Sequence, residues 1–291
     1  MNRKISKIFS KAIVVIASVC LFISCEKDDV ELEPTLNWKA ETIVDENEVA
    51  ATGVSNWFRA EEISDEVFSR MWLKSWKENC PLDRSELRYL KVLHRNADGK
   101  PQRGEMVVNA AIADKVLTIF MQLYEAGYRI ERMVLIDNFD ADDESSMRAN
   151  NSSSFNFRFM TGSTTKISKH GLGLAIDINT LYNPYVKQKS DGTWHIEPAT
   201  REEYAFNRDN RTDIPYKIDH EDLAYKLFTA AGFEWGGDWT SLKDYQHFEI
   251  QNSRLNMIEI QHRLQTIDAV ADVAEYCIDE CISVDTLRTC L

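Results

Sequence analysis

Two histidines and two aspartates have the residue types and the spacing that hydrolytic metal chemistry requires. His170 and Asp177 lie seven residues apart, and Asp244 precedes His247 by three residues. Two imidazoles and one carboxylate form the three-ligand set of catalytic zinc, which leaves a fourth position for water. We therefore expect His170, Asp177 and His247 to bind Zn2+. Asp244 is the expected general base, because zinc lowers the pKa of its bound water to about 7 and a nearby carboxylate can then take the proton.

Short strands are expected to carry these residues into a common site. Leu174–Ile178 alternates in the manner of a strand, and Asp177 lies between two isoleucines, so its carboxylate should be partly buried and in need of a partner. His247 leads into a second expected strand, Phe248–Ile250. Structural roles are the alternatives: Asp177 bonded to backbone on an exposed face, His247 as a hydrogen-bonded core residue, and Asp244 as a turn residue.

The motifs around these residues resemble those of the D-alanyl-D-alanine carboxypeptidase family. Residues 168–177 follow the pattern Ser-x-His-x-x-Gly-x-Ala-x-Asp, residues 235–239 follow Trp-Gly-Gly-x-Trp, and residues 244–248 follow Asp-x-x-His-Phe. The family also contains VanY- and VanX-type enzymes and phage L-alanyl-D-glutamate endopeptidases. The resemblance extends over roughly Glu86–Ile250, and it implies the same three metal ligands and the same base.

The resemblance also implies two residues that contact the substrate. Ser168, two residues before the first ligand, matches a serine that lines the family's substrate site. An arginine upstream normally steadies the developing oxyanion, an interaction worth several kcal/mol in such sites. Arg158 is the best match for it, and Arg148 is the alternative. The remaining histidines match no ligand position and are expected to be ordinary surface or core residues: His94, His195, His220 and His262.

The implied function is that of a zinc-dependent peptidase that hydrolyses peptidoglycan stem peptides, of the D-alanyl-D-alanine carboxypeptidase type. An L-alanyl-D-glutamate endopeptidase is the main alternative, because the motifs are common to both. A peptidase of the same fold acting on another dipeptide or on a protein is a further alternative. A non-catalytic wall-binding module is expected to lack a ligand or the base, whereas this sequence keeps both.

An α+β fold is expected to position the site. The resemblance implies a small antiparallel sheet with flanking helices and zinc at the sheet, as in the D-Ala-D-Ala peptidase and hedgehog-like fold, with a C-terminal helical appendage. Periodicity predicts helices over Asp65–Glu78, Ala110–Glu125 (N-cap Asn109, C′ residue Gly127) and Glu221–Ala231, and strands over Glu86–Leu93, Glu105–Val108 and Arg129–Ile136. A long polar stretch over residues 137–169 is expected to be functional, and a second polar insertion follows between Trp194 and Asp219.

The amino terminus predicts export. Four basic residues precede an apolar run, Ala12–Ile23, which is too short to span a bilayer and suits a signal peptide. Residues 21–25 resemble a bacterial lipoprotein cleavage box, although Phe22 departs from its usual aliphatic residue, so Cys25 is the expected lipidation site and membrane anchor. An ordinary secretory signal is the alternative. The expected segments are a signal peptide (1–24), an acidic tether and lead-in (25–65), the zinc peptidase domain (66–252) and a helical tail (253–291). The mature protein is expected to be anchored at the cell envelope, on either the periplasmic or the surface face of the outer membrane.

Net charge limits the possible partners of the protein, and cysteine content limits its possible disulfides. The formal charge is −13, and removing residues 1–24 with their four positive charges makes it −17. So acidic a chain argues against nucleic acid as a partner. Export permits disulfides, and the four remaining cysteines allow three pairings or stay as unpaired thiols: Cys80, Cys277, Cys281 and Cys290.

Overall fold

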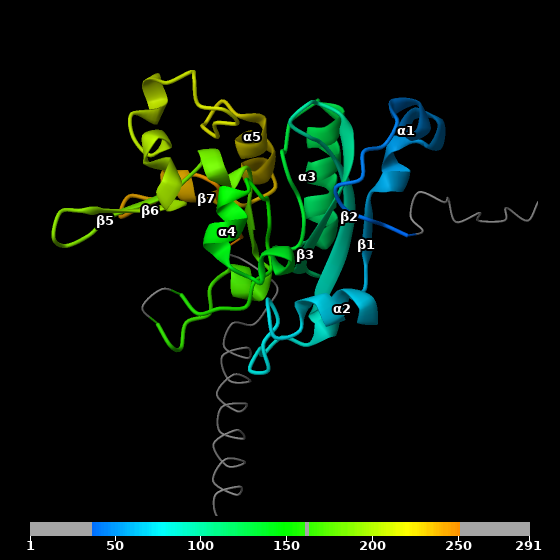
Figure 1. Ribbon diagram of the computed structural model, residues 1–291, viewed down its shortest axis with the longest axis horizontal. Coiled ribbons are helices and arrows are strands. Elements are labelled where there is room, and N and C mark those ends of the chain that lie inside the picture. The colour runs from blue at the N-terminus through cyan, green and yellow to red at the C-terminus, as the bar shows by residue number, and fades with distance from the viewer. Residues whose placement is uncertain (1–36, 161–162, 251–291) are drawn as a thin grey trace, which may run out of the picture. The chain divides into compact units, whose positions relative to one another are not determined.

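The computed structural model of the chain describes residues 37–160 and 163–250, which form several helices and three small antiparallel sheets (Figure 1). The α+β class is as predicted. Among the described residues, every helix is too short or too polar to cross a membrane. The expected signal peptide, the lipidation site Cys25, and the tail with its three cysteines lie outside the described residues.

The first sheet is an apolar scaffold. Its strands, β1 (Arg59–Glu61), β2 (Leu87–Arg95) and β3 (Pro101–Asn109), pair antiparallel in chain order. The Asn96 side chain holds the turn between β2 and β3, because it accepts hydrogen bonds from the Asp98 and Lys100 amides at 3.0 Å each. The predicted strands are confirmed, and both extend further than expected.

Helix α3 (Ala113–Glu125) packs its apolar face on β2 (Figure 1). It begins three residues later than predicted, since the Asn109 side chain does not cap it. Asn109 Oδ1 accepts from the Ala111 amide at 3.0 Å, and Asn109 Nδ2 donates to the Leu172 carbonyl oxygen at 3.1 Å. Asn109 therefore joins the scaffold to the segment that follows His170. Gly127 has φ +73° just beyond the helix, as a C′ glycine requires.

Helix α2 (Asp65–Met71) is shorter than predicted. The aromatic pattern predicted a helix to Glu78, but the chain turns back at Leu73, which has φ +61° and is 61% exposed. The rings of Phe68 and Trp76 lie 5.4 Å apart. In a continuous helix these two residues would be separated by about 12 Å along the axis. Burial of Trp76 against Phe68 therefore requires the turn.

The segment from residue 129 to residue 136 is not the strand that its apolar residues predicted. It exchanges single backbone hydrogen bonds with several neighbours, including Ile130 to Arg95 at 2.8 Å and Ser152 to Arg132 at 2.9 Å. It then enters a 3-10 turn, η4 (Ile136–Phe139). Among the described residues, no strand runs beside it for long enough to form a ladder, so this segment makes only isolated bridges.

The lead-in expected over residues 25–65 is, from residue 37 onward, part of the folded domain. Helix α1 (Glu46–Thr52) is capped by the Asp45 side chain, and strand β1 extends the first sheet. Trp57 is fully buried and packs near Trp38, with ring centroids 6.4 Å apart. A few large apolar residues among many acids were enough to anchor this segment, because one buried aromatic ring removes 150–250 Å² from water.

The site region is built from much shorter strands. One sheet has the order β4 (Ala175–Asp177), β9 (His247–Glu249), β7 (Glu234–Trp235), and the other has the order β6 (Trp194–Glu197), β5 (Tyr185–Gln188), β8 (Lys243–Asp244). Helix α5 (Leu223–Ala230) packs beside them, and its Phe228 stacks on Phe248 at 4.5 Å. Gly232 follows α5 with φ +89°, close to the predicted end.

Buried polar side chains hold the connecting segments. The stretch over residues 137–169 contains α4 (Asp143–Arg148) and a run of buried polar residues from Asn150 to Ser154. The Asn151 side chain bonds both the amide and the carbonyl of Val134, at 2.9 and 3.0 Å. In the second polar insertion, buried Arg208 donates to the Tyr182 carbonyl at 2.9 Å. These long loops are therefore ordered by hydrogen bonds rather than by regular structure.

Candidate active site

Strand pairing brings two of the expected ligands face to face. β4 and β9 are antiparallel, and Asp177 is the direct partner of His247 across the ladder. Such partners have Cβ atoms about 4.5–5.5 Å apart. His170 arrives from a 3-10 turn, η5 (His170–Leu172), which the left-handed Gly173 ends at φ +65°. The sequence separation of 70 residues between Asp177 and His247 is closed by a single pair of short strands.

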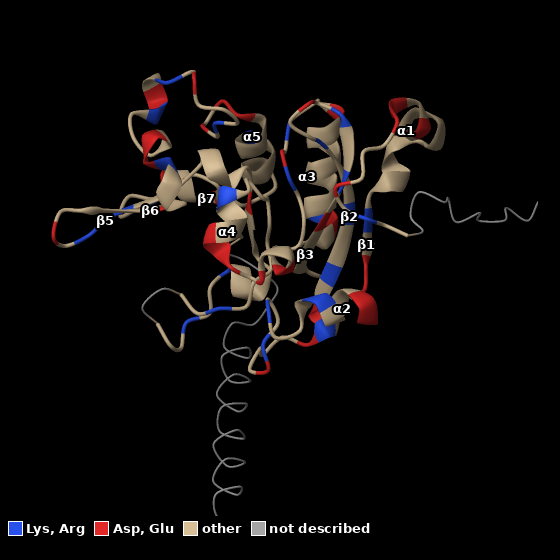
Figure 2. Cartoon of the chain, viewed as in Figure 1, with Lys and Arg blue, Asp and Glu red and all other residues tan. Residues whose placement is uncertain are grey.

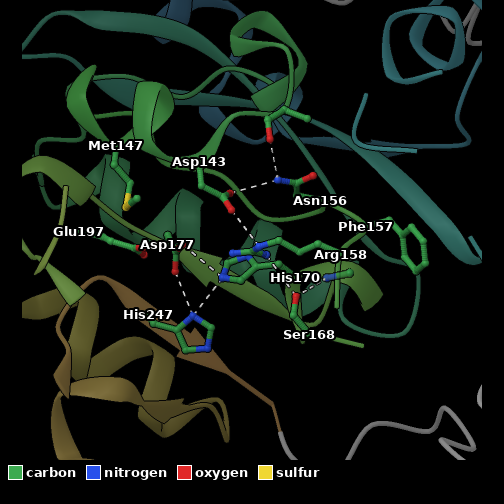
Figure 3. A network of polar contacts seen from close by, with 12 residues as sticks. Asp143, Met147, Asn156, Phe157, Arg158, Ser168, His170, Asp177, Glu197 and His247 are labelled. Carbon is green, nitrogen blue, oxygen red and sulfur yellow. Dashed lines mark hydrogen bonds and ion pairs between the residues drawn. The ribbon is translucent and has the colours of Figure 1, made fainter. Parts of the chain in front are cut away.

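The three expected ligands converge in one buried cluster (Figure 3). One ligand atom from each residue lies within 4.8 Å of the other two. His170 Nε2 is 3.2 Å from Asp177 Oδ2, His247 Nδ1 is 3.1 Å from Asp177 Oδ1, and the two ring nitrogens are 3.1 Å apart. The structure thus brings together the residues that the sequence selected.

The outer hydrogen bonds of the two imidazoles show that the cluster suits a cation. His170 Nδ1 lies 2.8 Å from the Ser154 carbonyl oxygen, which can only accept, so Nδ1 carries the proton and Nε2 presents a lone pair. His247 Nε2 lies 3.0 Å from Glu249 Oε2, so His247 Nδ1 presents its lone pair to the cluster by the same reasoning. Two lone pairs and a carboxylate that point at one another need a positive charge between them, and the residues therefore fit a zinc ion.

The electrostatics of the cluster agree with this requirement. Burial alone would lower the pKa of His247, but hydrogen bonds to Asp177 and Glu249 raise it to about 10. Burial would raise the pKa of Asp177, whereas the charges and hydrogen bonds of His170 and His247 hold it well below its ordinary value. In the metal-free protein, a proton on His247 supplies the positive charge that the cluster attracts.

Glu249 is a site residue that the motif analysis missed. It is two residues beyond His247 on β9, and alternate residues of a strand share a face. Its carboxylate orients the outer nitrogen of His247 at 3.0 Å, as carboxylates do behind metal-bound histidines. Burial would raise the pKa of Glu249, but the hydrogen bond and charge of His247 lower it overall. The spacing His-x-Glu within a predicted strand was the available signal.

Asp244 lies in the wall of the same cavity, on β8. Its Oδ1 is shielded from solvent and has no hydrogen-bond partner among the described residues. Burial raises the pKa of Asp244 to about 7; the charge of His247 opposes the shift and that of Asp177 adds to it. A carboxylate that titrates near neutral pH is suited to general base catalysis. Gly236 allows this packing, since a Cβ there would lie 2.6 Å from the Asp244 carbonyl oxygen.

Arg158, not Arg148, lies in the cavity. Arg158 Nη1 donates to Ser168 Oγ at 3.2 Å, and its Nε lies 2.8 Å from Asp143 Oδ2 (Figure 3). Arg148 pairs instead with Glu144 on the exposed side of α4. The Ser168 hydroxyl oxygen also accepts from a backbone amide at 3.0 Å. The guanidinium is therefore held on two sides beside the cluster.

Asp143 is a second residue that the motifs did not indicate. It is the first residue of α4 and lines the cavity. One carboxylate oxygen pairs with Arg158, and the other accepts from Asn156 Nδ2 at 3.1 Å (Figure 3). Its position 15 residues before Arg158 in a polar stretch gave no periodic pattern from which to find it.

The other histidines differ in their surroundings. His94 is buried in the scaffold, where burial lowers its pKa to about 4, and His220 pairs with Asp238 on the surface. His195 was expected to be an ordinary surface or core residue, but the structure places it in the cavity wall, 2.8 Å from Glu197. His262 lies outside the described residues. Cys80 is buried.

The cavity has a volume of about 640 Å³ and extends well beyond the cluster. One side is formed by α4 and the segment around Ser153, and the opposite side by the β5–β6 hairpin. This volume is within the usual range of about 300–1,000 Å³ for ligand sites. A chain segment longer than the two residues of a scissile bond can therefore lie along it.

The fold and the site define a metallopeptidase-type centre, and comparison with known proteins agrees. The sequence profile of the D-alanyl-D-alanine carboxypeptidase family matches residues 161–250. Over 85 residues, the chain is 36% identical to the peptidoglycan L-alanyl-D-glutamate endopeptidase CwlK of Bacillus subtilis (strain 168); the match covers 28% of this chain and 39% of that protein. No solved structure matches the chain, so the expected hedgehog-like likeness stays a prediction.

The segment from residue 161 to residue 250 thus matches the D-alanyl-D-alanine carboxypeptidase family of metallopeptidases, which confirms the resemblance that its motifs predicted. The chain spans about two fifths of the length of the curated relative. All three expected metal ligands and Asp244 fall inside the matched segment, whereas Arg158 and Asp143 precede it.

Proposed function

We propose that this protein is a zinc-dependent peptidase that hydrolyses peptidoglycan stem peptides. The observation that carries the proposal is the convergence of His170 Nε2, His247 Nδ1 and the Asp177 carboxylate, with their outer hydrogen bonds leaving only acceptors inside the cluster. These three residues would hold the zinc ion. Zinc bound there would supply Lewis acidity, which lowers the pKa of water and polarises a carbonyl group.

The protein's own residues perform the remaining steps. Asp244, with its pKa near neutral, accepts a proton from the attacking water and then passes it to the leaving amine. Arg158 stabilises the negative charge that develops on the carbonyl oxygen, and Asp143 and Ser168 hold its guanidinium in place. Glu249 keeps His247 in the tautomer that a ligand needs.

The bond that is cleaved has two candidates. The matching family profile supports a D-alanyl-D-alanine carboxypeptidase, which we take as the first assignment. The identity to an L-alanyl-D-glutamate endopeptidase supports that second activity, and so does a cavity long enough for residues on both sides of the bond.

Mass spectrometry of purified muropeptides incubated with the zinc-loaded protein tests the proposal. Loss of one alanine identifies a carboxypeptidase, and cleavage after L-alanine identifies an endopeptidase. Intact muropeptides in the presence of stoichiometric bound zinc would overturn the peptidoglycan substrate and leave a peptidase for other dipeptides or proteins.

We also propose that the chain is exported and anchored to the cell envelope through a lipid on Cys25. The basic residues, the apolar run and the cysteine at its end support this. Several acyl chains on one cysteine would anchor stably where a single chain would not. The expected result is an acylated Cys25 at the amino terminus of the mature chain, seen by mass spectrometry; an unmodified mature terminus elsewhere would contradict it.

A further inference from the structure

The β5–β6 hairpin forms one wall of the cavity, and its pairing register arranges the side chains in rows. Tyr185 on β5 lies directly opposite Asp244 on β8. Two residues further along β5, Lys187 lies opposite His195 on β6. Because alternate residues of a strand share a face, Tyr185 and Lys187 lie on the same side of β5, and both line the cavity together with Lys189, the residue after the strand.

Lys187 and Lys189 are cations of the cavity wall, and Asp191 at the hairpin tip interacts electrostatically with Lys189. Both are exposed, and within residues 37–160 and 163–250 neither ammonium group makes an ion pair or a hydrogen bond. The formal net charge of the whole chain is −13, so these two cations in one cavity wall have the opposite sign to the net charge of the molecule. Figure 2 shows both basic and acidic positions on the β5–β6 hairpin, with acidic colour at its tip.

The other charged side chains of the cavity, outside the metal cluster and Asp244, already have partners. These pairs are Arg158 with Asp143, His195 with Glu197, and Asp191 with Thr193. Asp191 at the hairpin tip interacts electrostatically with Lys189 and offsets part of its charge, although it forms no ion pair with it. The ammonium groups of Lys187 and Lys189 can therefore contact a ligand that occupies the cavity.

Strand geometry places this charge at a defined distance from the reacting groups. A strand rises about 3.3 Å per residue, so Lys187 lies about 7 Å along β5 from Tyr185, the residue opposite the expected base. Lys189 follows the end of β5 and lies at most about 14 Å from Tyr185, the reach of four residues of chain. An extended peptide in the cavity advances by a similar length per residue. A group of the substrate that reaches the two lysines is therefore two to four residues away from the bond that is cleaved.

We propose that Lys187 and Lys189 form a subsite for a carboxylate of an acidic peptide substrate, two to four residues from the bond cleaved. The inference rests on the proposed peptidase function and deepens it, since it names a feature by which the enzyme selects its substrates. The two ammonium groups distinguish a peptide with a free carboxylate from the same peptide with a carboxamide.

The test uses three synthetic peptides and the full-length zinc-loaded protein. The parent peptide is L-Ala–γ-D-Glu–L-Lys–D-Ala–D-Ala; in one analogue D-isoglutamine replaces D-glutamate, and in the other the C-terminus is an amide. We expect the wild-type protein to prefer the parent over one analogue by roughly fivefold in kcat/KM at low salt, the size that exposed ion pairs contribute. The analogue that loses activity identifies which carboxylate binds.

The second part of the test removes the two positive charges from the hairpin. In the double variant Lys187→Gln/Lys189→Gln, the ratio between parent and analogue should fall to about one, mainly through KM. Lys100→Gln is the matched control, because Lys100 is exposed in the β2–β3 turn, away from the cavity. Added salt should reduce the wild-type ratio and leave that of the double variant unchanged, because salt screens exposed charges.

Calorimetric binding of the same peptides to the Asp244→Asn variant, with and without the two lysine substitutions, separates this proposal from the proposed function. Binding that favours the carboxylate peptide and needs the lysines supports the subsite even where no cleavage occurs. Cleavage of all three peptides at equal rates, unchanged in the double variant, overturns the subsite and leaves the peptidase standing. If the peptides are neither cleaved nor bound, both the subsite and the proposed peptidase function are overturned.

Discussion

The scaffold and the site region of this domain are held together by different forces. The scaffold has two nine-residue strands and a 13-residue helix whose apolar faces are buried against each other. The site region has strands of two to four residues, joined by loops that buried asparagines and Arg208 hold in place. Apolar burial tolerates small shifts of the chain, whereas a hydrogen bond weakens steeply with angle and distance.

The difference has a functional meaning. A metal centre needs its ligand atoms fixed to within about 0.5 Å. The ladder pair Asp177–His247 and the outer bonds to Ser154 and Glu249 provide that precision locally. The scaffold contributes stability from a distance, through contacts such as Asn109 with the Leu172 carbonyl. Substitutions in the two regions should therefore have different consequences.

The largest effect is expected from removing a ligand or the base. His247→Ala should lose both the metal and all activity, because the remaining two ligands no longer form a zinc set. Asp244→Asn should keep the metal and lower kcat by on the order of 10²–10⁴-fold, the usual contribution of a general base. Elemental analysis and steady-state kinetics on both variants check this. Wild-type turnover in Asp244→Asn would show that another group is the base.

The pH dependence of kcat/KM should be set by the ionisation of the Asp244 carboxylate. Asp244 acts as a base only when deprotonated, so kcat/KM should fall as the pH drops through the pKa of Asp244, which is about 7 in the metal-free protein. A bound cation favours the charged carboxylate and lowers that pKa, so the acid limb of the zinc form should lie below pH 7. Rates measured from about pH 5 to about pH 8 locate the limb. An identical limb in Asp244→Asn would assign it to a different residue.

Glu249→Gln tests the outer support of the metal centre. The amide can still accept a hydrogen bond from His247, but it carries no charge, so zinc affinity should fall by about 10–100-fold. Competition with a chelator measures the affinity directly. If zinc binds as tightly as in the wild type, the contact between Glu249 and His247 serves packing and not the metal.

Asp143→Asn tests whether Arg158 depends on its partner. The substitution keeps an acceptor for Asn156 and removes the charge that faces Arg158 at 2.8 Å, so kcat/KM should fall by roughly tenfold, the value of a charge-assisted hydrogen bond. Asp142→Asn is the control, since it removes the same charge one residue earlier and keeps an equally good helix cap. Equal losses in the two variants would mean that only the charge or stability of α4 matters.

Trp57→Ala should have the smallest effect on the site. This residue is fully buried in the scaffold, so the free energy of unfolding should fall by about 3–5 kcal/mol. Zinc affinity and the pH profile of the folded fraction should stay as in the wild type. Chemical denaturation and chelator competition measure the two quantities separately. Loss of zinc affinity in the folded fraction would contradict the division between scaffold and site.

Elements with a sustained apolar period were predictable from sequence. The apolar face of α3, the apolar strand β2 and the end of α5 all occur close to where the pattern put them. Secondary-structure prediction failed in segments with an apolar sequence pattern whose conformation depends on packing against other parts of the chain. The chain turns at Leu73 because Trp76 packs back on Phe68, and residues 129–136 stay irregular because no strand accompanies them.

The sequence by itself determined which residues could bind a metal, because imidazoles and carboxylates in those motifs have few other uses. It also determined the α+β class and the order of the main elements. Only the tertiary structure decided that Arg158 and not Arg148 reaches the cavity, that Asp143 and Glu249 support the site, and that Lys187 and Lys189 line it. The physical reason is that a residue's chemistry is local, whereas its partners are set by strand register and loop packing between segments far apart in the chain.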